Sequence, residues 1–448
     1  MATKELTKGN PYKLILLFML PIFIGNAFQQ MYMLVDSLIV GRIIGLNALA
    51  AVGATGPLIF LIISFVFSST QGFTIITAQK FGAGEFDLVK KSFAASIILS
   101  SLVALILTLI STPFSYILLD FLRTPHDIIS SSASYLVIMF AGIFATVFYN
   151  LSSNIIRALG DSKTPLYFLV LSSFINIFMD LLFIIKFNMG IKGAAYATVV
   201  AQALSTILCA SYMFTKFPIL RLKKQDWSLS KEFLYEHLRV GIPMGIQMSV
   251  MTIGIIAVQY VLNTFGSTAV ASFTAATRID QMFSQVFVAL GATMAVFAAQ
   301  NYGANQIGRI KQGVKAGVTI TISLSLTIIL LITLFSKYMI LWFMSEINQE
   351  VVTLAQQYLY IIMFFYIFFG FLMVFRNVMQ GTGNAIGPLF SGLCELFARI
   401  FCAIVLGNYF GYVGICVATP MAWVVGTILL YILFKISLNK QTYNNRTD

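Results

Sequence analysis

Twelve long apolar runs constrain the fold of this chain more than any other feature. Each run reaches about the 20 residues that a helix needs to cross the hydrocarbon of a bilayer, and several runs exceed that length. Only 10% of the residues are charged, whereas a soluble protein carries about 25%, so a soluble enzyme and a disordered chain are both excluded. The sequence therefore predicts an all-α integral membrane protein with twelve transmembrane helices. The predicted helices span residues 14–40, 50–79, 93–112, 132–156, 164–186, 193–214, 238–262, 270–300, 314–336, 353–375, 388–406 and 414–436.

The basic residues are distributed unevenly between the connections. A net charge of +12 would suggest nucleic acid for a soluble protein, but in a membrane protein it is typical of the positive-inside bias. If the N-terminus is cytoplasmic, the connections on its side carry 21 Lys and Arg residues, Arg376 included, against five on the opposite side. We therefore expect a multi-pass cell-membrane protein with both termini in the cytoplasm and no nucleic-acid partner. The five opposite residues are Arg42, Arg123, Lys186, Lys192 and Lys337.

The two halves of the sequence repeat one another. Similar segments recur in the same order at an offset of 221 to 223 residues, and Pro21 and Pro243 stand at equivalent points. Repeats of this kind are typical of transporters whose binding site lies between the two halves. The paired segments are AQKFGAGEFDLVKK (78–91) with AQNYGANQIGRIKQ (299–312), NIIRALGDSKTP (154–165) with NVMQGTGNAIGP (377–388), and MGIKGAAYAT (189–198) with FGYVGICVAT (410–419).

The repeat predicts the domain organisation. We expect an N-lobe at 1–215, a basic cytoplasmic linker at 216–237 and a C-lobe at 238–448. Six helices per lobe is an even number, so both lobes run in the same direction across the membrane. The two lobes are then related by a pseudo-two-fold axis along the membrane normal.

Four acidic residues fall inside predicted spans, namely Asp36, Asp180, Asp280 and Glu395. A charge in hydrocarbon costs about 2.5–3.5 kcal/mol on insertion scales and is a functional candidate. Asp36 and Asp180 have no Lys or Arg within a helical turn, so each is ready to take a proton or to bind a bare cation. A purely structural role, with the carboxylate satisfied by backbone or hydroxyl groups, is the alternative.

Polar and soft side chains share a helix face with these two aspartates. Tyr32 and Met33 lie one turn before Asp36, Gln29 lies two turns before it, and Asn176 lies one turn before Asp180. These residues are candidates for a cation site and a substrate cavity.

The second half carries a different charge pattern. Glu395 and Arg399 are spaced i, i+4, which favours an ion pair within one helix, and a structural role and a cavity role are both open. Arg278 and Asp280 are spaced i, i+2 and do not face each other. We therefore expect the partner of Asp280 to come from another helix.

Further polar side chains inside the spans are more typical of interhelical hydrogen bonds than of ligands. Thr198 and Asn154 are stronger candidates for ligands than the others, because they lie in the same lobe as Asp36 and Asp180. The remaining ones are Asn150, Gln202 and Gln247.

Cysteine and histidine usage gives no sign of an enzyme. The four cysteines lie in apolar stretches, without the spacing of a disulfide or a metal site. The two histidines, His126 and His237, lie near the predicted membrane edges, and no nucleophile–base spacing appears. We therefore expect no enzymatic activity and no cofactor. The cysteines are Cys209, Cys394, Cys402 and Cys416.

Several motifs together resemble the multidrug and toxic compound extrusion (MATE) family over essentially the whole chain. They are LPIFIGNAFQQMYMLVDSLIVGR in the first predicted helix, AQKFGAGE, RALGDSKTP, QGTGNAIGP, and INIFMD before and including Asp180. The resemblance implies two six-helix lobes and antiport of a substrate against protons or sodium. It also implies a coupling site formed by Asp36, Asn176, Asp180 and Thr198, with Asn154 nearby.

One departure from the family pattern concerns the second lobe. NorM-like members place cation-binding acidic residues there, where this chain has Met251 and, approximately, Phe369. Neither side chain can bind an ion, so the chain resembles DinF-like or MepA-like members, with coupling in the first lobe. The candidate substrate-cavity residues are Gln29, Tyr32, Met33, Gln247, Met251, Glu395 and Arg399.

The resulting functional expectation is a monomeric secondary-active antiporter. It would export small organic compounds, cationic or amphipathic, in exchange for H⁺ or Na⁺. A lipid-linked sugar flippase of the same superfamily is one alternative, although unpaired Asp36 and Asp180 argue against a cavity for pyrophosphate. A membrane signalling or scaffold protein that transports nothing is the other.

Overall fold

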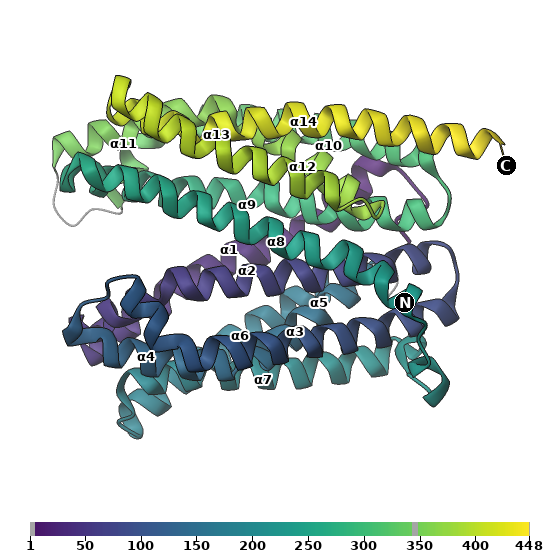
Figure 1. The fold of residues 1–448 in the computed structure, drawn as a ribbon, viewed down its shortest axis with the longest axis horizontal. Coiled ribbons are helices and arrows are strands. Elements are labelled where there is room, and N and C mark those ends of the chain that lie inside the picture. Colours follow the sequence, from purple (N-terminus) through teal and green to yellow (C-terminus); the bar gives the residue numbers. More distant parts are fainter. Residues whose placement is uncertain (1–4, 343–347, 448) are drawn as a thin grey trace. The chain divides into compact units, whose positions relative to one another are not determined.

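Fourteen α-helices form within residues 5–342 and 348–447, the part of the chain that the computed structural model describes (Figure 1). The side chains of 438–447 are not among the described ones. The helices are α1 Pro11–Ile39, α2 Leu46–Gly82, α3 Phe86–Phe121, α4 His126–Ala141, α5 Ile143–Ala158, α6 Lys163–Leu181, α7 Gly190–Lys216, α8 Lys231–Leu262, α9 Ser267–Gly303, α10 Ile307–Trp342, α11 Gln349–Ile362, α12 Tyr366–Gly381, α13 Ile386–Phe410 and α14 Tyr412–Thr447.

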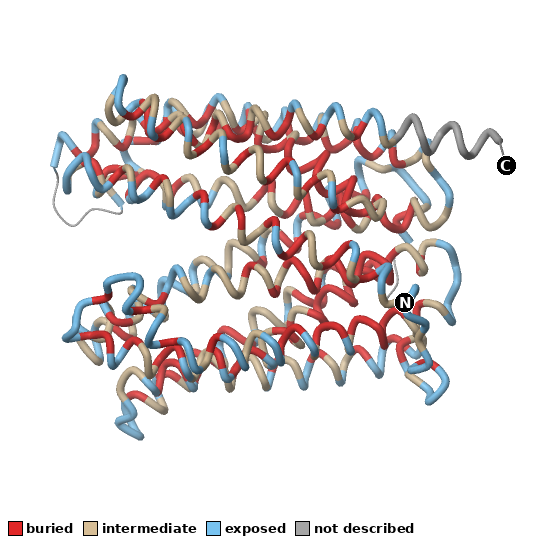
Figure 2. The backbone as a smooth tube through the Cα atoms, in the orientation of Figure 1, coloured by how far each residue is buried: buried red, intermediate tan, exposed pale blue. Residues whose placement is uncertain are grey.

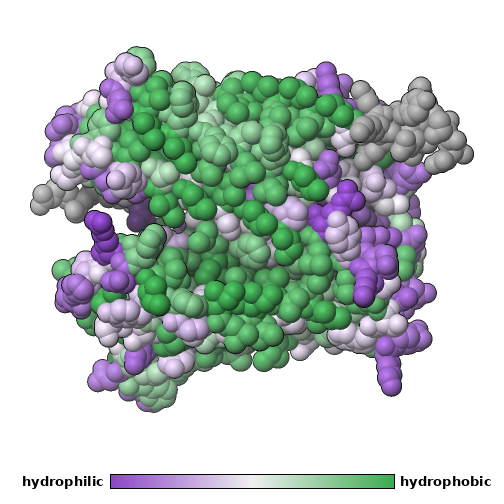
Figure 3. All heavy atoms as spheres, viewed as in Figure 1, coloured by the Kyte–Doolittle hydropathy of each residue, from purple (hydrophilic) through white to green (hydrophobic). Residues whose placement is uncertain are grey.

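The described helices confirm the predicted membrane spans. Eleven helices or continuous helix pairs are long and apolar enough to cross a membrane, and α11 with α12 forms one of them. The pair α4 and α5, bent by 46° at their junction, forms the twelfth. Hydrophobic side chains cover the middle stretches of the helices on the face shown in Figure 3, and hydrophilic side chains gather at the helix ends. This distribution fits a bilayer around the helix middles.

The break between α4 and α5 is held by side chains from two other helices. Gly142 stands at the break, and its backbone packs so closely on Val199 of α7 that a Cβ would collide. The hydroxyl of Thr108 in α3 donates to the Phe140 carbonyl at 3.2 Å, and that of Thr206 in α7 donates to the Ala145 carbonyl at 3.0 Å. These bonds satisfy backbone groups that hydrocarbon would leave unsatisfied.

Residues 24–249 form a first compact unit, here called unit 1. It contains α2 to α7, the second part of α1 and the first part of α8. Within it α2 packs on α3 and α5, and α7 packs on α5 and α6. Gly72 of α2 and Gly241 of α8 bring their backbones into direct contact, a close approach that small residues permit between membrane helices.

Residues 6–23 and 250–448 form a second compact unit, unit 2. It contains α9 to α14, the start of α1 and the second part of α8. Its largest core gathers aromatic and aliphatic side chains around α9 and α12, where Phe287 and Tyr366 stack with ring centroids 5.8 Å apart. The buried positions in Figure 2 lie mainly where helices of the same unit face one another.

The first helix of each repeat therefore changes unit part-way along its length. The start of α1 is anchored in unit 2, where the Leu6 amide donates to Gln300 of α9 at 2.9 Å and the Leu6 carbonyl accepts from Arg309 of α10 at 3.2 Å. The predicted linker holds two 3₁₀ turns, Pro218–Leu220 and Lys224–Trp227. From Lys231 onward it is helical, so α8 begins seven residues before the predicted start at 238.

Candidate functional site: a carboxyl pair in unit 1

Asp36 and Asp180 both stand just before a helix changes its winding. One π-helical turn, Val40–Ile44, follows α1, and another, Leu182–Lys186, follows α6. Their wider hydrogen bonds run from Gly45 N to Val40 O (3.3 Å) and from Phe187 N to Leu182 O (3.1 Å). The two turns contact each other. Single π turns inside helices are frequent at functional sites, and here they bring the ends of α1 and α6 together.

The carboxyl groups of Asp36 and Asp180 lie within hydrogen-bonding reach of each other. A carboxylate has no donor, so a hydrogen bond between the two groups would need a proton on one of them. Asp180 is fully buried, and the Oδ1 atoms of both residues have no hydrogen-bond partner within the described part of the chain. The pair is therefore placed to share one proton, and its two unpartnered oxygen atoms are available to a further ligand.

Asn176 connects the pair to its surroundings. The orientation of its amide follows from the network: Nδ2 donates to Asp180 Oδ2 at 2.8 Å and to the Tyr32 hydroxyl oxygen at 3.0 Å, and Oδ1 accepts from the Thr198 backbone N–H at 3.1 Å. The Thr198 side-chain oxygen lies 3.3 Å from the amide group. Thus α1, α6 and α7 all contribute to one cluster, as the helix spacings predicted for Asn176 and Tyr32.

Tyr135 of α4 lies near the cluster and was missed by the sequence analysis. Its ring is buried, and it interacts electrostatically with both Asp36 and Asp180. A tyrosine inside an apolar span carries no spacing signal of its own, because its neighbours in the cluster come from helices far away in the sequence.

Four other predicted residues of unit 1 differ in their burial and in the contacts described for them. Asn154 is buried but donates to Thr70 of α2 at 3.4 Å, so it joins α5 to α2. Gln29 and Met33 are exposed on α1, Met33 to 54%. Gln247 is buried within α8. The placement of Asn154 in the coupling cluster thus finds no support in the described contacts.

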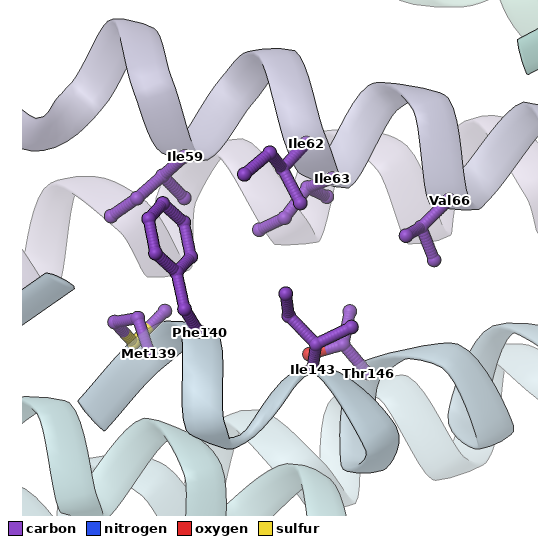
Figure 4. A pocket seen from close by; sticks show the side chains of 8 residues that line it. All are labelled: Ile59, Ile62, Ile63, Val66, Met139, Phe140, Ile143 and Thr146. Carbon is purple, nitrogen blue, oxygen red and sulfur yellow. The ribbon is translucent and has the colours of Figure 1, made fainter. Parts of the chain in front are cut away.

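An apolar pocket lies beside the break between α4 and α5 (Figure 4). Ile59, Ile62, Ile63 and Val66 of α2 face α4 and α5 across it, and Thr146 is its one hydroxyl-bearing residue. No lining side chain is charged, so the pocket suits an apolar group rather than an ion. The remaining lining residues are Met139, Phe140 and Ile143.

Unit 2 corrects two predictions about charged residues. Arg376, placed by the sequence analysis in a cytoplasmic connection, is buried inside α12. Its Nη2 atom donates to Glu395 Oε1 at 2.6 Å and to Oε2 at 2.8 Å. The expected pair of Glu395 with Arg399 is therefore wrong, because Arg376 reaches the carboxylate from a neighbouring helix. Without Arg376 the basic residues still favour one side of the membrane by 20 to five.

The side chains of three basic residues in that charge comparison fall outside the described part of the chain. Lys4 lies outside the described residues, and the side chains of Lys440 and Arg446 lie outside the described ones.

Arg399 turns toward α8 instead of toward Glu395. Its Nη1 atom donates to the backbone carbonyl of Met251 at 3.4 Å, and Arg376 Nη1 donates to Met251 Sδ at 3.3 Å. Both guanidinium groups are almost fully buried, at 3% and 4% exposed for Arg399 and Arg376. Phe369, by contrast, packs on Trp423 with ring centroids 4.6 Å apart.

Asp280 finds two partners on other helices, as predicted, and a third, Ser284, on its own helix α9. Tyr366 donates to Oδ1 at 2.7 Å, Tyr358 to Oδ2 at 3.2 Å, and Ser284 to Oδ1 at 3.1 Å. Unit 2 therefore holds its carboxylates with arginine or hydroxyl donors, whereas unit 1 pairs two carboxyl groups with each other.

The oxygen atoms of the unit 1 cluster suit a proton or a hard cation. Carboxylate, amide and hydroxyl oxygens are the ligands that hard cations prefer. Among the described residues, no group of three or more His, Cys, Asp or Glu side chains could hold a metal ion, and the four cysteines are free thiols. The chemistry available is thus proton exchange or weak cation binding.

Comparison with known proteins identifies relatives over the whole chain. The MatE family profile matches residues 21–182 and again 243–405, beginning at the two prolines that the repeat aligns. The probable multidrug resistance protein YoeA of Bacillus subtilis is 30% identical over 96% of this chain and 95% of its own length. NorM of Thermotoga maritima is 24% identical over 87% of this chain and 84% of its own length, and MepA of Staphylococcus haemolyticus is 23% identical over 90% and 89%.

Solved structures show the same fold. An outward-facing multidrug resistance MATE transporter superposes with a TM-score of 0.91 at 24% identity, covering 98% of this chain and 99% of that one. A MOP superfamily transporter from Pyrococcus furiosus gives the same score at 24% identity, covering 99% of both chains. The double profile match and the full-length relatives lead to one conclusion: this chain belongs to the MATE family of multidrug transporters.

Proposed function

We propose that this chain is a secondary-active antiporter of the cell membrane that exports cationic or amphipathic organic compounds in exchange for protons. The observation that carries the proposal is the close approach of the Asp36 and Asp180 carboxyl groups, which favours one proton shared between them because two adjacent negative charges repel. No described basic side chain forms an ion pair with either residue, so loss of that proton adds a second negative charge that a cationic substrate can neutralise.

The cycle follows from competition for this charge. With the site open to the more acidic exterior, the pair takes a proton and a cationic substrate leaves. With the site open to the cytoplasm, substrate binding favours proton release, because a protonated pair attracts a cation less. Asn176 orients Asp180, and Thr198 and Tyr32 orient Asn176. The apolar pocket beside α2 supplies a surface for the apolar part of the substrate.

Sodium is the second candidate for the coupling ion. The unpartnered Oδ1 atoms of Asp36 and Asp180, with the amide of Asn176, offer oxygen ligands for it. The proton is favoured because two carboxyl groups this close together repel each other unless one of them is protonated. The charge bias supports cytoplasmic termini, and one chain supplies both units, which supports a monomeric transporter.

The test uses purified protein in liposomes loaded with rhodamine 123, a cationic dye. A proton gradient and a sodium gradient are imposed separately, and dye movement is followed by fluorescence. We expect the proton gradient to drive transport in the wild type and not in Asp36→Asn or Asp180→Asn. Asp87→Asn is the matched control, since Asp87 is exposed and bonds only Lys90 at 3.0 Å among the contacts described. Transport driven only by sodium would reassign the ion, and transport in both aspartate variants would refute the coupling site.

A further inference from the structure

Two buried guanidinium groups in unit 2 compete for one carboxylate. Arg376 takes both oxygens of Glu395, and Ser391 donates to the same carboxylate at 3.0 Å. Arg399 makes no ion pair with a described residue, and its Nε atom and that of Arg376 have no hydrogen-bond partner there. The side chains of Arg376, Arg399 and Glu395 together therefore carry one net positive charge.

The remaining donors point at weak acceptors. Arg376 Nη1 donates to a thioether sulfur and Arg399 Nη1 to a distant carbonyl, both on Met251. A thioether is a weak acceptor, whereas a guanidinium forms its strongest bonds with carboxylate, phosphate and similar anions. Met251 thus stands where an anionic group would bind both arginines better.

Neighbouring helices leave room for these charged side chains. A Cβ atom on Gly254 of α8 would lie 3.0 Å from Arg399 Nη1, and one on Gly426 of α14 would lie 2.6 Å from Glu395 Oε1. Both positions carry glycine, which places backbone rather than side chain beside the cluster. The site is therefore built from α8, α12, α13 and α14.

The nearest alternative source of negative charge in unit 2 is already satisfied. Asp280 accepts hydrogen bonds from Tyr358, Tyr366 and Ser284, and it forms no ion pair with Arg399. A buried charge without a partner destabilises the folded protein. An anion bound beside Arg399 would therefore offset this unfavourable free energy.

We propose that Arg376 and Arg399 bind one anionic group, a carboxylate, sulfonate or phosphate, carried by an exported compound. This inference rests on the proposed export function and extends its substrates to compounds that carry an anionic group beside the cationic one, with the anionic group bound by the arginines of unit 2. A lipid headgroup offers the same phosphate chemistry and is a second source of the ligand.

The test compares two dyes that differ in this one group. Rhodamine 110 carries a free carboxylate, and rhodamine 123 is its methyl ester. Binding of each to protein in phosphatidylcholine nanodiscs is measured by fluorescence polarisation without any ion gradient. We expect the wild type to bind rhodamine 110 roughly tenfold more tightly, the factor for about one charge-assisted hydrogen bond. Arg399→Gln should remove the difference by weakening rhodamine 110 alone, while Arg278→Gln, at an exposed arginine of α9, should leave it unchanged.

Two further variants separate recognition from folding. Arg399→Lys should keep part of the preference, because it retains the charge without the fork of donors. Glu395→Gln should strengthen rhodamine 110 binding, because it removes the competing carboxylate. Unchanged rhodamine 123 binding shows in each case that the variant is folded. Equal affinity for both dyes in the wild type, or an equal loss of both in Arg399→Gln, would overturn the proposal.

Added phosphatidylglycerol distinguishes the two sources of the anion. If it weakens rhodamine 110 binding in the wild type and not in Arg399→Gln, an anionic lipid headgroup reaches the same arginines, which supports the site. A decrease of the same size in the wild type and in Arg399→Gln would mean that the lipid acts elsewhere. If the two dyes also bind with equal affinity in phosphatidylcholine, the proposed site is overturned. Because no gradient is present, these results do not depend on whether protons drive export.

Discussion

The two units share a helix order and differ in how they hold buried charge. In unit 1, the carboxyl groups of Asp36 and Asp180 approach each other, and no described basic side chain forms an ion pair with them. In unit 2, Glu395 bonds Arg376 and Asp280 bonds two tyrosines, so both carboxylates are satisfied without a proton. A repeat can thus preserve a helix order while its two copies differ in how their buried carboxyl groups are partnered. The comparison predicts that coupling and stability depend on different units.

The largest expected effect is on coupling. Asp36→Asn or Asp180→Asn should reduce proton-driven export to the leak of protein-free liposomes, because an amide cannot release a proton. Both proteins should remain folded, since the amide can still hydrogen-bond its partner. Export with a normal proton requirement in the Asp36→Asn/Asp180→Asn double variant would remove the functional difference between the units.

The next effect is on stability and belongs to unit 2. Arg376→Met leaves Glu395 buried without its partner, and breaking such a pair costs about 3–5 kcal/mol. The melting temperature of the detergent-solubilised protein should fall clearly. The Arg376→Met/Glu395→Leu variant should recover most of the loss, because well-packed apolar residues can replace a buried ion pair. A melting temperature as low in the double variant as in Arg376→Met would contradict this explanation.

The pH dependence of substrate affinity should come from the carboxyl groups of unit 1 alone. Rhodamine 123 affinity should fall as the pH is lowered from 8 to 5, because the proton removes the charge that the dye neutralises. The slope approaches about tenfold per pH unit if one proton competes with the dye. In Asp180→Asn the affinity should be flat over this range. A flat wild-type profile would rule out competition and favour sodium as the coupling ion.

A smaller effect is expected at Met251. Met251→Ala should change the relative affinities of different substrates by less than about tenfold, because it removes one thioether contact to Arg376 and no titrating group. The proton requirement for export should persist. Its loss would mean that ion coupling extends into unit 2.

The smallest effect is expected at Asn154. Its described bond is a long one to Thr70, so Asn154→Ala should cost about 1 kcal/mol of stability and leave the proton dependence of export unchanged. Loss of the proton dependence in Asn154→Ala would instead show that Asn154 takes part in coupling, although its described contact is with Thr70.

Local spacing predicted the parts of the site that lie on one helix. Tyr32 precedes Asp36, and Asn176 precedes Asp180, by one turn, and these pairs do meet in the cluster. The twelve spans were also predictable, because the thickness of a bilayer fixes the length of each apolar run. These features depend only on residues close together in the sequence.

Contacts between distant helices could not be predicted in the same way. The spacing of Glu395 and Arg399 suggested an ion pair, but Arg376 lies closer in space, 19 residues earlier in the chain. Arg376 stands near the end of an apolar run, so the charge pattern alone placed it in a connection. The tyrosine partners of Asp280 and the position of Tyr135 likewise depend on tertiary packing, which overrides local preference.

Proton release on substrate binding tests the central claim most directly. Rhodamine 123 is added to purified protein in a weakly buffered solution near neutral pH, and the change in pH is calibrated against added acid. The carboxyl pair of unit 1 predicts that the wild type releases up to one proton for each dye bound, that Asp180→Asn releases none, and that Asp87→Asn behaves as the wild type. No release from the wild type, or equal release from Asp180→Asn, would contradict the assignment of coupling to Asp36 and Asp180.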